Sequence, residues 1–103
     1  MKHDEIKDRH VVMGVTESSI GWVYYYDGKM DLAIEQLKNA VNIYDTYEKN
    51  STYASNAHAS LSTLYSENAD FELAQEEAQR SIDIAMINDY TVGYLNGYEA
   101  LGN

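Results

Sequence analysis

The sequence predicts an all-α protein made of antiparallel helix-turn-helix repeats, with about five helices. The 103 residues contain no proline and only 6 glycines, and residues that favour helices are common. Apolar residues recur at steps of three and four, as on one face of a helix. A residue pattern also returns after 41 positions, which is typical of helical repeats. The length suits a single domain, 1–103.

The repeated pattern fills two stretches and begins a third. The first is ESSIGWVYYYDGKMDLAIEQLKNAV, with Ile20, Gly21, Tyr24, Gly28, Ala33, Leu37 and Ala40. The second is HASLSTLYSENADFELAQEEAQRSI, with Leu61, Ser62, Tyr65, Ala69, Ala74, Ala78 and Ser81 at the same spacing. The final YEALGN places Leu101 and Gly102 a further 40 residues on. We therefore expect repeat 1 at 8–48, repeat 2 at 51–87 and, at 89–103, the first helix of a truncated third repeat that acts as a cap.

The first repeat is expected to form helices at 8–26 and 30–48, after a flexible amino-terminal segment, 1–7. Gly21 lets a neighbouring backbone approach the first helix, and Asp27-Gly28 supplies a left-handed helix end. The face expected to be buried in the first helix is Met13, Glu17, Ile20, Gly21 and Tyr24. The stripe expected in the second is Ala33, Leu37, Ala40, Tyr44 and Tyr47.

The second repeat is expected to form helices at 51–67 and 71–87, and a fifth helix follows at 90–102. Asn50 or Ser51 caps the third helix and Asp70 caps the fourth. The third helix carries the apolar residues Ala54, Ala57, Leu61, Leu64 and Tyr65. The fourth carries a stripe of small residues, Ala74, Ala78, Ser81 and Ala85. Such helix pairs bury their apolar faces by stacking on one another.

This spacing resembles that of the tetratricopeptide repeat, although the usual period is about 34 residues. The first repeat agrees at its Gly, Tyr, Gly, Ala and Ala positions. The second departs at Ser62, Ala69 and Ala78, and both lack the closing proline. The resemblance implies a right-handed α-solenoid that binds proteins. Long-period versions of the repeat are familiar from bacterial regulatory and sensor proteins.

The resemblance also implies where a partner binds, because the first helices of such units line a concave groove. The groove residues expected from spacing on each helix face are Val15, Ser18, Trp22, Tyr25, Asn56, Ala59, Thr63 and Asn96. Trp22 and Tyr25 are the expected aromatic anchors for a peptide or helix. The alternative is that Trp22 packs on the amino-terminal segment or on a neighbouring molecule. The family's best-known ligand is a terminal carboxylate held by cations, but the matching positions here are Ser18, Ser19, Trp22, Asn56, Ser60, Asn96 and Ala100. We therefore do not expect that ligand.

The C-terminal helix carries more apolar residues than one contact stripe needs. We expect self-association, as a homodimer or longer stack, through Tyr94, Leu95, Tyr98 and Leu101. The alternatives are cover by the rest of a parent protein and a monomer with a modest exposed patch.

Charge and composition exclude several classes of partner. Seventeen acidic and seven basic residues give a net charge of −10, so neither nucleic acid nor an anionic membrane is an expected partner. The charged start MKHDEIKDRH has no apolar run behind it, and we expect a cytoplasmic protein. No cysteine is available for a thiolate metal site.

No catalytic or metal-binding arrangement stands out, and we expect neither an enzyme nor a cofactor. His3, His10 and His58 are scattered and are interpreted as solvated polar residues. QEEAQR, at 75–80, is interpreted as a solvated helix face. The favoured function is a protein-interaction module within a larger regulatory or signalling protein. The alternative is a free-standing small acidic inhibitor of a basic partner, and a pure self-association scaffold is a third idea.

Overall fold

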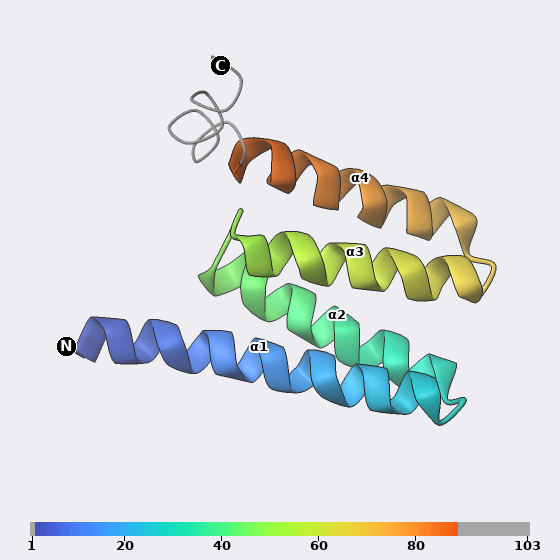
Figure 1. Cartoon of the computed structure of the whole chain (residues 1–103), viewed down its shortest axis with the longest axis horizontal. Helices are drawn as coiled ribbons and strands as arrows, with labels where there is room; N and C mark the ends of the chain where they lie inside the picture. Colours follow the sequence, from blue (N-terminus) through green and yellow to red (C-terminus); the bar gives the residue numbers. More distant parts are fainter. Residues whose placement is uncertain (1, 89–103) are drawn as a thin grey trace, which may run out of the picture.

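The chain folds into a succession of antiparallel helices (Figure 1). The computed structural model describes residues 2–88, with side chains from residue 9 onward. The helices in this range are α1 (Lys2–Tyr26), α2 (Met30–Tyr47), α3 (Thr52–Glu67) and α4 (Phe71–Asn88). α1 packs on α2 and α3 packs on α4, and the two hairpins meet where α2 contacts α3. Residues 2–88 contain no strand, so the predicted all-α class is confirmed.

The two hairpins turn through the same backbone motif. In the first, Lys29 N–H donates to the Tyr24 carbonyl at 2.8 Å and Gly28 N–H donates to Tyr25 at 3.1 Å. Gly28 has a φ of 78°, so the predicted left-handed helix end is confirmed. In the second, Asp70 and Ala69 donate to Tyr65 and Ser66 over the same distances. Ala69 therefore takes a left-handed φ of 65° at the position where the first hairpin has glycine.

Ser51, one of the two predicted caps, precedes α3 and caps its first turn. Its side-chain oxygen accepts a hydrogen bond from the Ala54 N–H at 3.1 Å, which satisfies a donor that the helix itself leaves free. The Asp70 carbonyl accepts the Ala74 N–H at 2.9 Å in the first turn of α4. The Asp70 carboxylate instead accepts from the Asn68 side chain.

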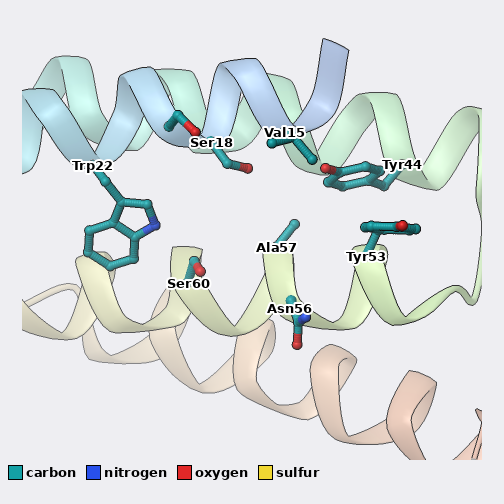
Figure 2. A pocket seen from close by; sticks show the side chains of 9 residues that line it. Val15, Ser18, Trp22, Tyr44, Tyr53, Asn56, Ala57 and Ser60 are labelled. Carbon is teal, nitrogen blue, oxygen red and sulfur yellow. The ribbon is translucent and has the colours of Figure 1, made fainter. Parts of the chain in front are cut away.

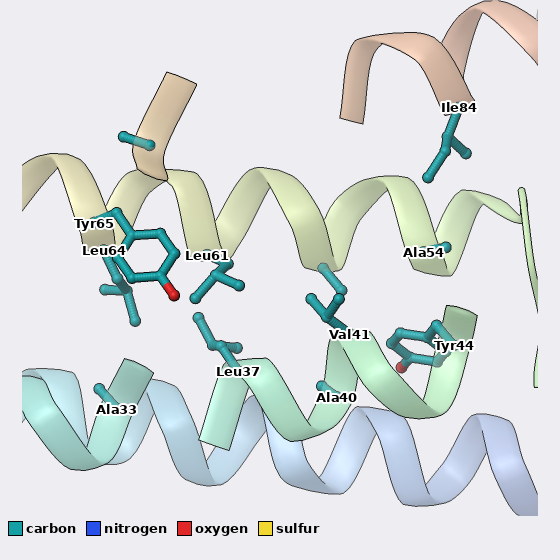
Figure 3. Packing of buried hydrophobic residues seen from close by; sticks show 12 residues of the cluster. Ala33, Leu37, Ala40, Val41, Tyr44, Ala54, Leu61, Leu64, Tyr65 and Ile84 are labelled. Atoms are coloured by element: carbon teal, nitrogen blue, oxygen red, sulfur yellow. The ribbon is translucent and has the colours of Figure 1, made fainter. Parts of the chain in front are cut away.

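The core lies between the helices of both hairpins (Figure 3). Leu37 of α2 and Leu61 of α3 point toward one another, Leu64 of α3 lies one turn further along, and all three are almost fully buried. The predicted stripes are confirmed at Ala33, Leu37, Ala40 and Tyr44 of α2 and at all five predicted positions of α3. In α4, Ala74 is buried and Ala78, Ser81 and Ala85 are half-buried. Ile84, which the pattern of small residues did not include, is fully buried.

Glycines bring α1 close to α2. A Cβ on Gly21 would lie 3.2 Å from the Ala33 carbonyl oxygen, so the predicted close approach of a neighbouring backbone is confirmed. A Cβ on Gly14 would overlap the Tyr44 ring. In the second hairpin, Ser62 stands at the position of Gly21, and its hydroxyl donates a hydrogen bond to the Ala74 carbonyl at 2.7 Å. Both arrangements let the paired helices lie close together.

Several predicted details differ from the structure. Met13 and Ile20 are 47% and 38% exposed, because the glycines rather than the larger residues face α2. Tyr47 is 55% exposed and stacks on His10 with ring centroids 3.6 Å apart. α1 begins at Lys2, earlier than the predicted start of the first helix at residue 8. The predicted fifth helix and cap at 89–103, with Tyr94, Leu95, Asn96, Tyr98 and Leu101, lie outside the described residues.

Candidate functional site

A hollow of 230 Å³ lies between α1 and α3 (Figure 2). α1 supplies one wall, α3 the other, and Tyr44 of α2 closes one end. Its lining residues are Val15, Ser18, Ser19, Trp22, Tyr44, Tyr53, Asn56, Ala57 and Ser60. α1 and α3 run in the same direction, so residues at successive turns of each helix face one another along the hollow.

The structure brings together half of the predicted groove residues. Val15, Ser18, Trp22 and Asn56 line the hollow. Ala59 and Thr63 are exposed on α3 outside this lining, and Tyr25 lies one turn beyond Trp22. Asn96 lies outside the described residues. The predicted set did not include five of the lining residues, Ser19, Tyr44, Tyr53, Ala57 and Ser60. Tyr44 was missed because the spacing argument considered no contribution from α2, and the other four lie beside the predicted positions on α1 and α3.

Aromatic side chains stand at one end of the hollow. Tyr44 and Tyr53 stack with ring centroids 5.7 Å apart and an angle of 21° between the rings. Burial raises the pKa of Tyr44, and the neighbouring Tyr53 adds to the shift. Gly14 leaves the space into which the Tyr44 ring fits. This end of the hollow is therefore built by three helices.

Trp22 marks the other end, and its indole nitrogen points along the hollow toward the Ser18 side (Figure 2). Its ring meets Tyr25 edge to face, with centroids 5.3 Å apart and an angle of 85°. Tyr26 lies 6.3 Å from Trp22 and 5.2 Å from Tyr25. A hydrogen bond to the Glu67 carboxylate of α3 is the main cause that raises the pKa of Tyr25. Trp22 and Tyr25 also pack on the core, so the aromatic group is anchored rather than free.

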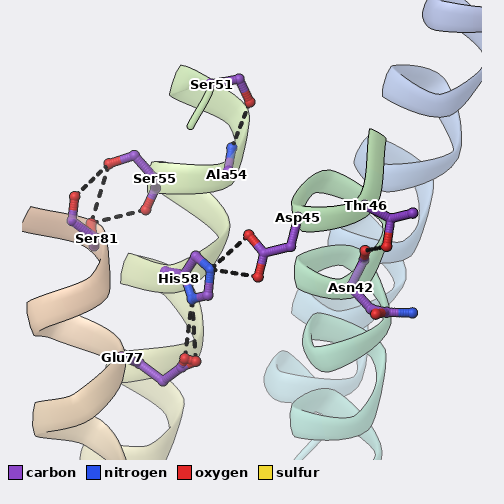
Figure 4. A network of polar contacts seen from close by, with 9 residues as sticks. All are labelled: Asn42, Asp45, Thr46, Ser51, Ala54, Ser55, His58, Glu77 and Ser81. Carbon is purple, nitrogen blue, oxygen red and sulfur yellow. Dashed lines mark hydrogen bonds and ion pairs between the residues drawn. The ribbon is translucent and has the colours of Figure 1, made fainter. Parts of the chain in front are cut away.

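A separate polar cluster ties three helices together around His58 (Figure 4). His58 of α3 is 3% exposed, so its interpretation as a solvated residue is wrong. Its Nε2 lies 3.1 Å from Asp45 of α2, and its Nδ1 lies 3.1 Å from Glu77 of α4. Burial lowers the pKa of His58, but hydrogen bonds to Glu77 and Asp45 and the charges of both carboxylates outweigh it, so the pKa lies above its ordinary value. An imidazolium with two N–H donors fits this arrangement.

Glu77 also corrects the interpretation of residues 75–80. Gln75, Glu76, Gln79 and Arg80 are exposed as expected, while Glu77 is turned toward α3 and bound to His58. One turn further along, Ser55 and Ser81 exchange hydrogen bonds between α3 and α4 at 2.9 to 3.0 Å. The α3–α4 contact therefore contains partly buried polar contacts beside the apolar ones.

The described residues hold neither a membrane span nor a metal site. None of the helices in the described part of the chain is long and apolar enough to cross a membrane. Among those same residues, no three His, Asp or Glu side chains are placed to hold a metal ion.

Comparison with known families identifies the fold. A family model of the tetratricopeptide repeat matches residues 12–86, which span most of α1 and all but the end of α4. The chain belongs to the tetratricopeptide repeat family, and the fold is a helical-repeat solenoid. Repeats of this family generally act as protein–protein interaction modules and are typically non-catalytic. No curated protein and no solved structure matches the chain significantly.

Proposed function

We propose that the hollow between α1 and α3 binds a peptide or helix of another protein, with Trp22 as its main anchor. The observation that carries this proposal is the meeting of Val15, Ser18 and Trp22 from one repeat with Asn56 from the next in a single hollow. Half-buried aromatic residues in such positions dominate the binding energy of many protein interfaces. Hydroxyl and amide groups along the rim supply hydrogen bonds that orient a bound chain.

The size of the hollow supports a side chain as its occupant. Sites for small molecules usually enclose about 300–1,000 Å³. The 230 Å³ here is below that range. One or two apolar side chains of a partner fit such a space, while the rest of the partner lies over the exposed faces of α1 and α3. In this proposal the chain forms part of a larger regulatory or signalling protein in the cytoplasm, and it has no catalytic activity.

A selection from a random-peptide display library on the immobilised chain tests this function. We expect selected peptides to carry large apolar residues and to lose binding to Trp22→Ala. Phe71→Ala is the matched control, because Phe71 is an exposed aromatic residue at the start of α4. Peptides that bind Trp22→Ala as well as the original chain would place the binding surface elsewhere and refute the proposal.

A free-standing acidic inhibitor is the alternative, favoured by the net charge of −10. In that case the affinity for the partner depends on long-range electrostatic attraction by the whole protein, and it falls steeply as the salt concentration rises. Binding in the hollow depends mainly on buried apolar contacts and keeps most of its affinity in 0.5 M salt (roughly a 4 Å screening length). A salt series on the selected peptides therefore separates the two functions.

Contact between copies is a further proposal, made on the sequence pattern of residues 90–102 alone. The apolar residues Tyr94, Leu95, Tyr98 and Leu101 support it. Light scattering over a concentration series tests it, with the double variant Tyr98→Glu, Leu101→Glu for comparison. We expect the original chain to associate and the variant to remain monomeric. A monomer for both at high concentration would exclude association through these residues.

A further inference from the structure

The residues that line the hollow carry no charge of their own, so charged groups beside it and the net charge of the chain decide which charges a partner can bring. The residues that line it include Ser, Asn and Tyr but no Lys or Arg. At the end marked by Trp22, the Glu67 carboxylate of α3 interacts with Tyr25 and raises the pKa of its hydroxyl. The protein as a whole carries −10. An acidic peptide is therefore repelled from this site, and a basic one is attracted.

The aromatic group beside Glu67 adds a second, independent preference for a cation. Trp22, Tyr25 and Tyr26 lie with ring centroids 5.2 to 6.3 Å apart, and none of the three pairs is stacked face to face. An edge-to-face contact covers only one face of one ring, and Tyr26 is 81% exposed. Ring faces within reach of a carboxylate attract a guanidinium or ammonium group through the ring quadrupole as well as through charge. Arg also stacks on such rings with its planar group.

We propose that the partner segment is cationic: an Arg or Lys side chain lies on the Trp22–Tyr25–Tyr26 rings with its charge at Glu67, and an adjacent apolar side chain fills the hollow beside Val15 and Ala57. This inference rests on the proposed function, since it names the chemistry of the segment that the hollow binds. It is the opposite of a clamp for a terminal carboxylate, which requires cations on these helices. The site thereby selects basic amphipathic segments and rejects acidic ones.

The random-peptide selection tests this chemistry when it is repeated on two variants of equal net charge. Glu67→Gln removes the carboxylate at the aromatic end. Glu76→Gln removes an exposed carboxylate of α4 and is the matched control. We expect Arg and Lys to be enriched at a fixed distance from the apolar residue in peptides selected on the original chain. The enrichment persists with Glu76→Gln and disappears with Glu67→Gln.

Titration of one selected peptide gives the size of the effect. Trp22 is the single tryptophan of the chain, so its fluorescence reports binding in the hollow directly. Replacing the Arg of the peptide by neutral citrulline should weaken binding about fivefold, the range of an exposed cation–π contact with a partly screened ion pair. The same replacement should have no effect on binding to Glu67→Gln.

The outcomes distinguish this inference from the function on which it rests. If the selected peptides require Trp22 but are not enriched in Arg or Lys, the proposed peptide-binding function stands, and the inference that the partner is cationic is overturned. If the enrichment of Arg and Lys in the selected peptides falls equally with Glu67→Gln and Glu76→Gln, its cause is the net charge, and the proposed contact at Glu67 is overturned. Peptides that bind independently of Trp22 contradict the proposed function itself.

Discussion

His58 binds a carboxylate on each side, so its protonation state contributes to the stability of the fold. Its folded pKa lies above the ordinary value because the bonds to Glu77 and Asp45 outweigh the effect of burial. A raised pKa means that the contribution is fully present below about pH 6.5, the unfolded value, and is lost as pH rises through the folded pKa. The two carboxylates then face a neutral ring.

We therefore expect the free energy of unfolding to fall as pH rises above about 6.5, and His58→Gln to abolish most of that dependence. The variant should also be less stable near pH 6 by about 1–3 kcal/mol, since Asp45 and Glu77 lose a charged partner while remaining partly solvated. Urea unfolding at a series of pH values measures both effects. His10→Gln, which replaces the histidine stacked on Tyr47, should keep the pH dependence. A variant with the original pH profile would show that His58 is not the titrating group.

The role of His58 was not predictable from sequence periodicity. Its partners lie 13 residues before it and 19 after it, on two different helices, and only the packing of α2, α3 and α4 brings them together. Residues that act within their own turn were predictable. Gly28 indicates a helix end because glycine adopts a left-handed φ easily. Ser51 indicates a helix start because its side chain accepts a hydrogen bond from a free N–H of the first turn.

Ala69 occupies the left-handed position that Gly28 holds in the first hairpin. A side chain there costs about 1 kcal/mol, because its Cβ crowds the following carbonyl. Ala69→Gly should raise the free energy of unfolding by about 0.5–1 kcal/mol. Thermal unfolding of the variant measures this gain. Ala59→Gly, at an exposed site inside α3, should have the opposite sign. A loss of stability in both variants would mean that the φ of Ala69 carries no strain.

At the scale of the helices, α1 differs from the other three because its apolar residues are spread around it. Val12, Val15 and Val23 are exposed, while Gly14 and Gly21 lie where α1 comes closest to the residues of α2. Apolar periodicity therefore predicted the helix but placed Met13 and Ile20 on the wrong side. In α2 and α3 the apolar stripe is narrow, and the predicted buried faces agree with the structure. Helical spacing also predicted part of the groove, because it places residues on the facing sides of α1 and α3. It could not predict Tyr44, which comes from α2 and fits into the space beside Gly14.

Gly14→Ala tests this contact between elements. The added methyl overlaps the Tyr44 ring, which is held by Tyr53 and by burial. We expect a net loss of about 1–2 kcal/mol, because overpacking exceeds the gain in helix propensity. Tyr44 should also move in the hollow and weaken peptide binding. Thr16→Ala, at an exposed position of α1, is the control for propensity alone. Unchanged stability and binding in Gly14→Ala would show that Tyr44 moves aside without cost.

At the scale of the whole molecule, the two hairpins share one core. Leu37 of the first hairpin points toward Leu61 of the second, and both are buried with Leu64 in that core. The bond from Asp45 to His58 crosses the same boundary. A hairpin that loses its neighbour exposes these leucines to water. The loss of burial of one such side chain is worth about 1.5–3 kcal/mol, which is large beside the stability of a small domain.

We expect neither hairpin to fold alone. Peptides of residues 1–49 and 50–103 separate the chain in the turn between α2 and α3, and each should show little helix by circular dichroism, since short isolated helices are marginal in water. An equimolar mixture should regain helix as the concentration rises, because the shared core forms again between the two peptides. The intact chain should unfold in one transition when followed by circular dichroism and by Trp22 fluorescence. A cooperative thermal transition in the 1–49 peptide alone would show that the first hairpin is an independent unit. The groove between α1 and α3 would then join two folding units instead of lying within one.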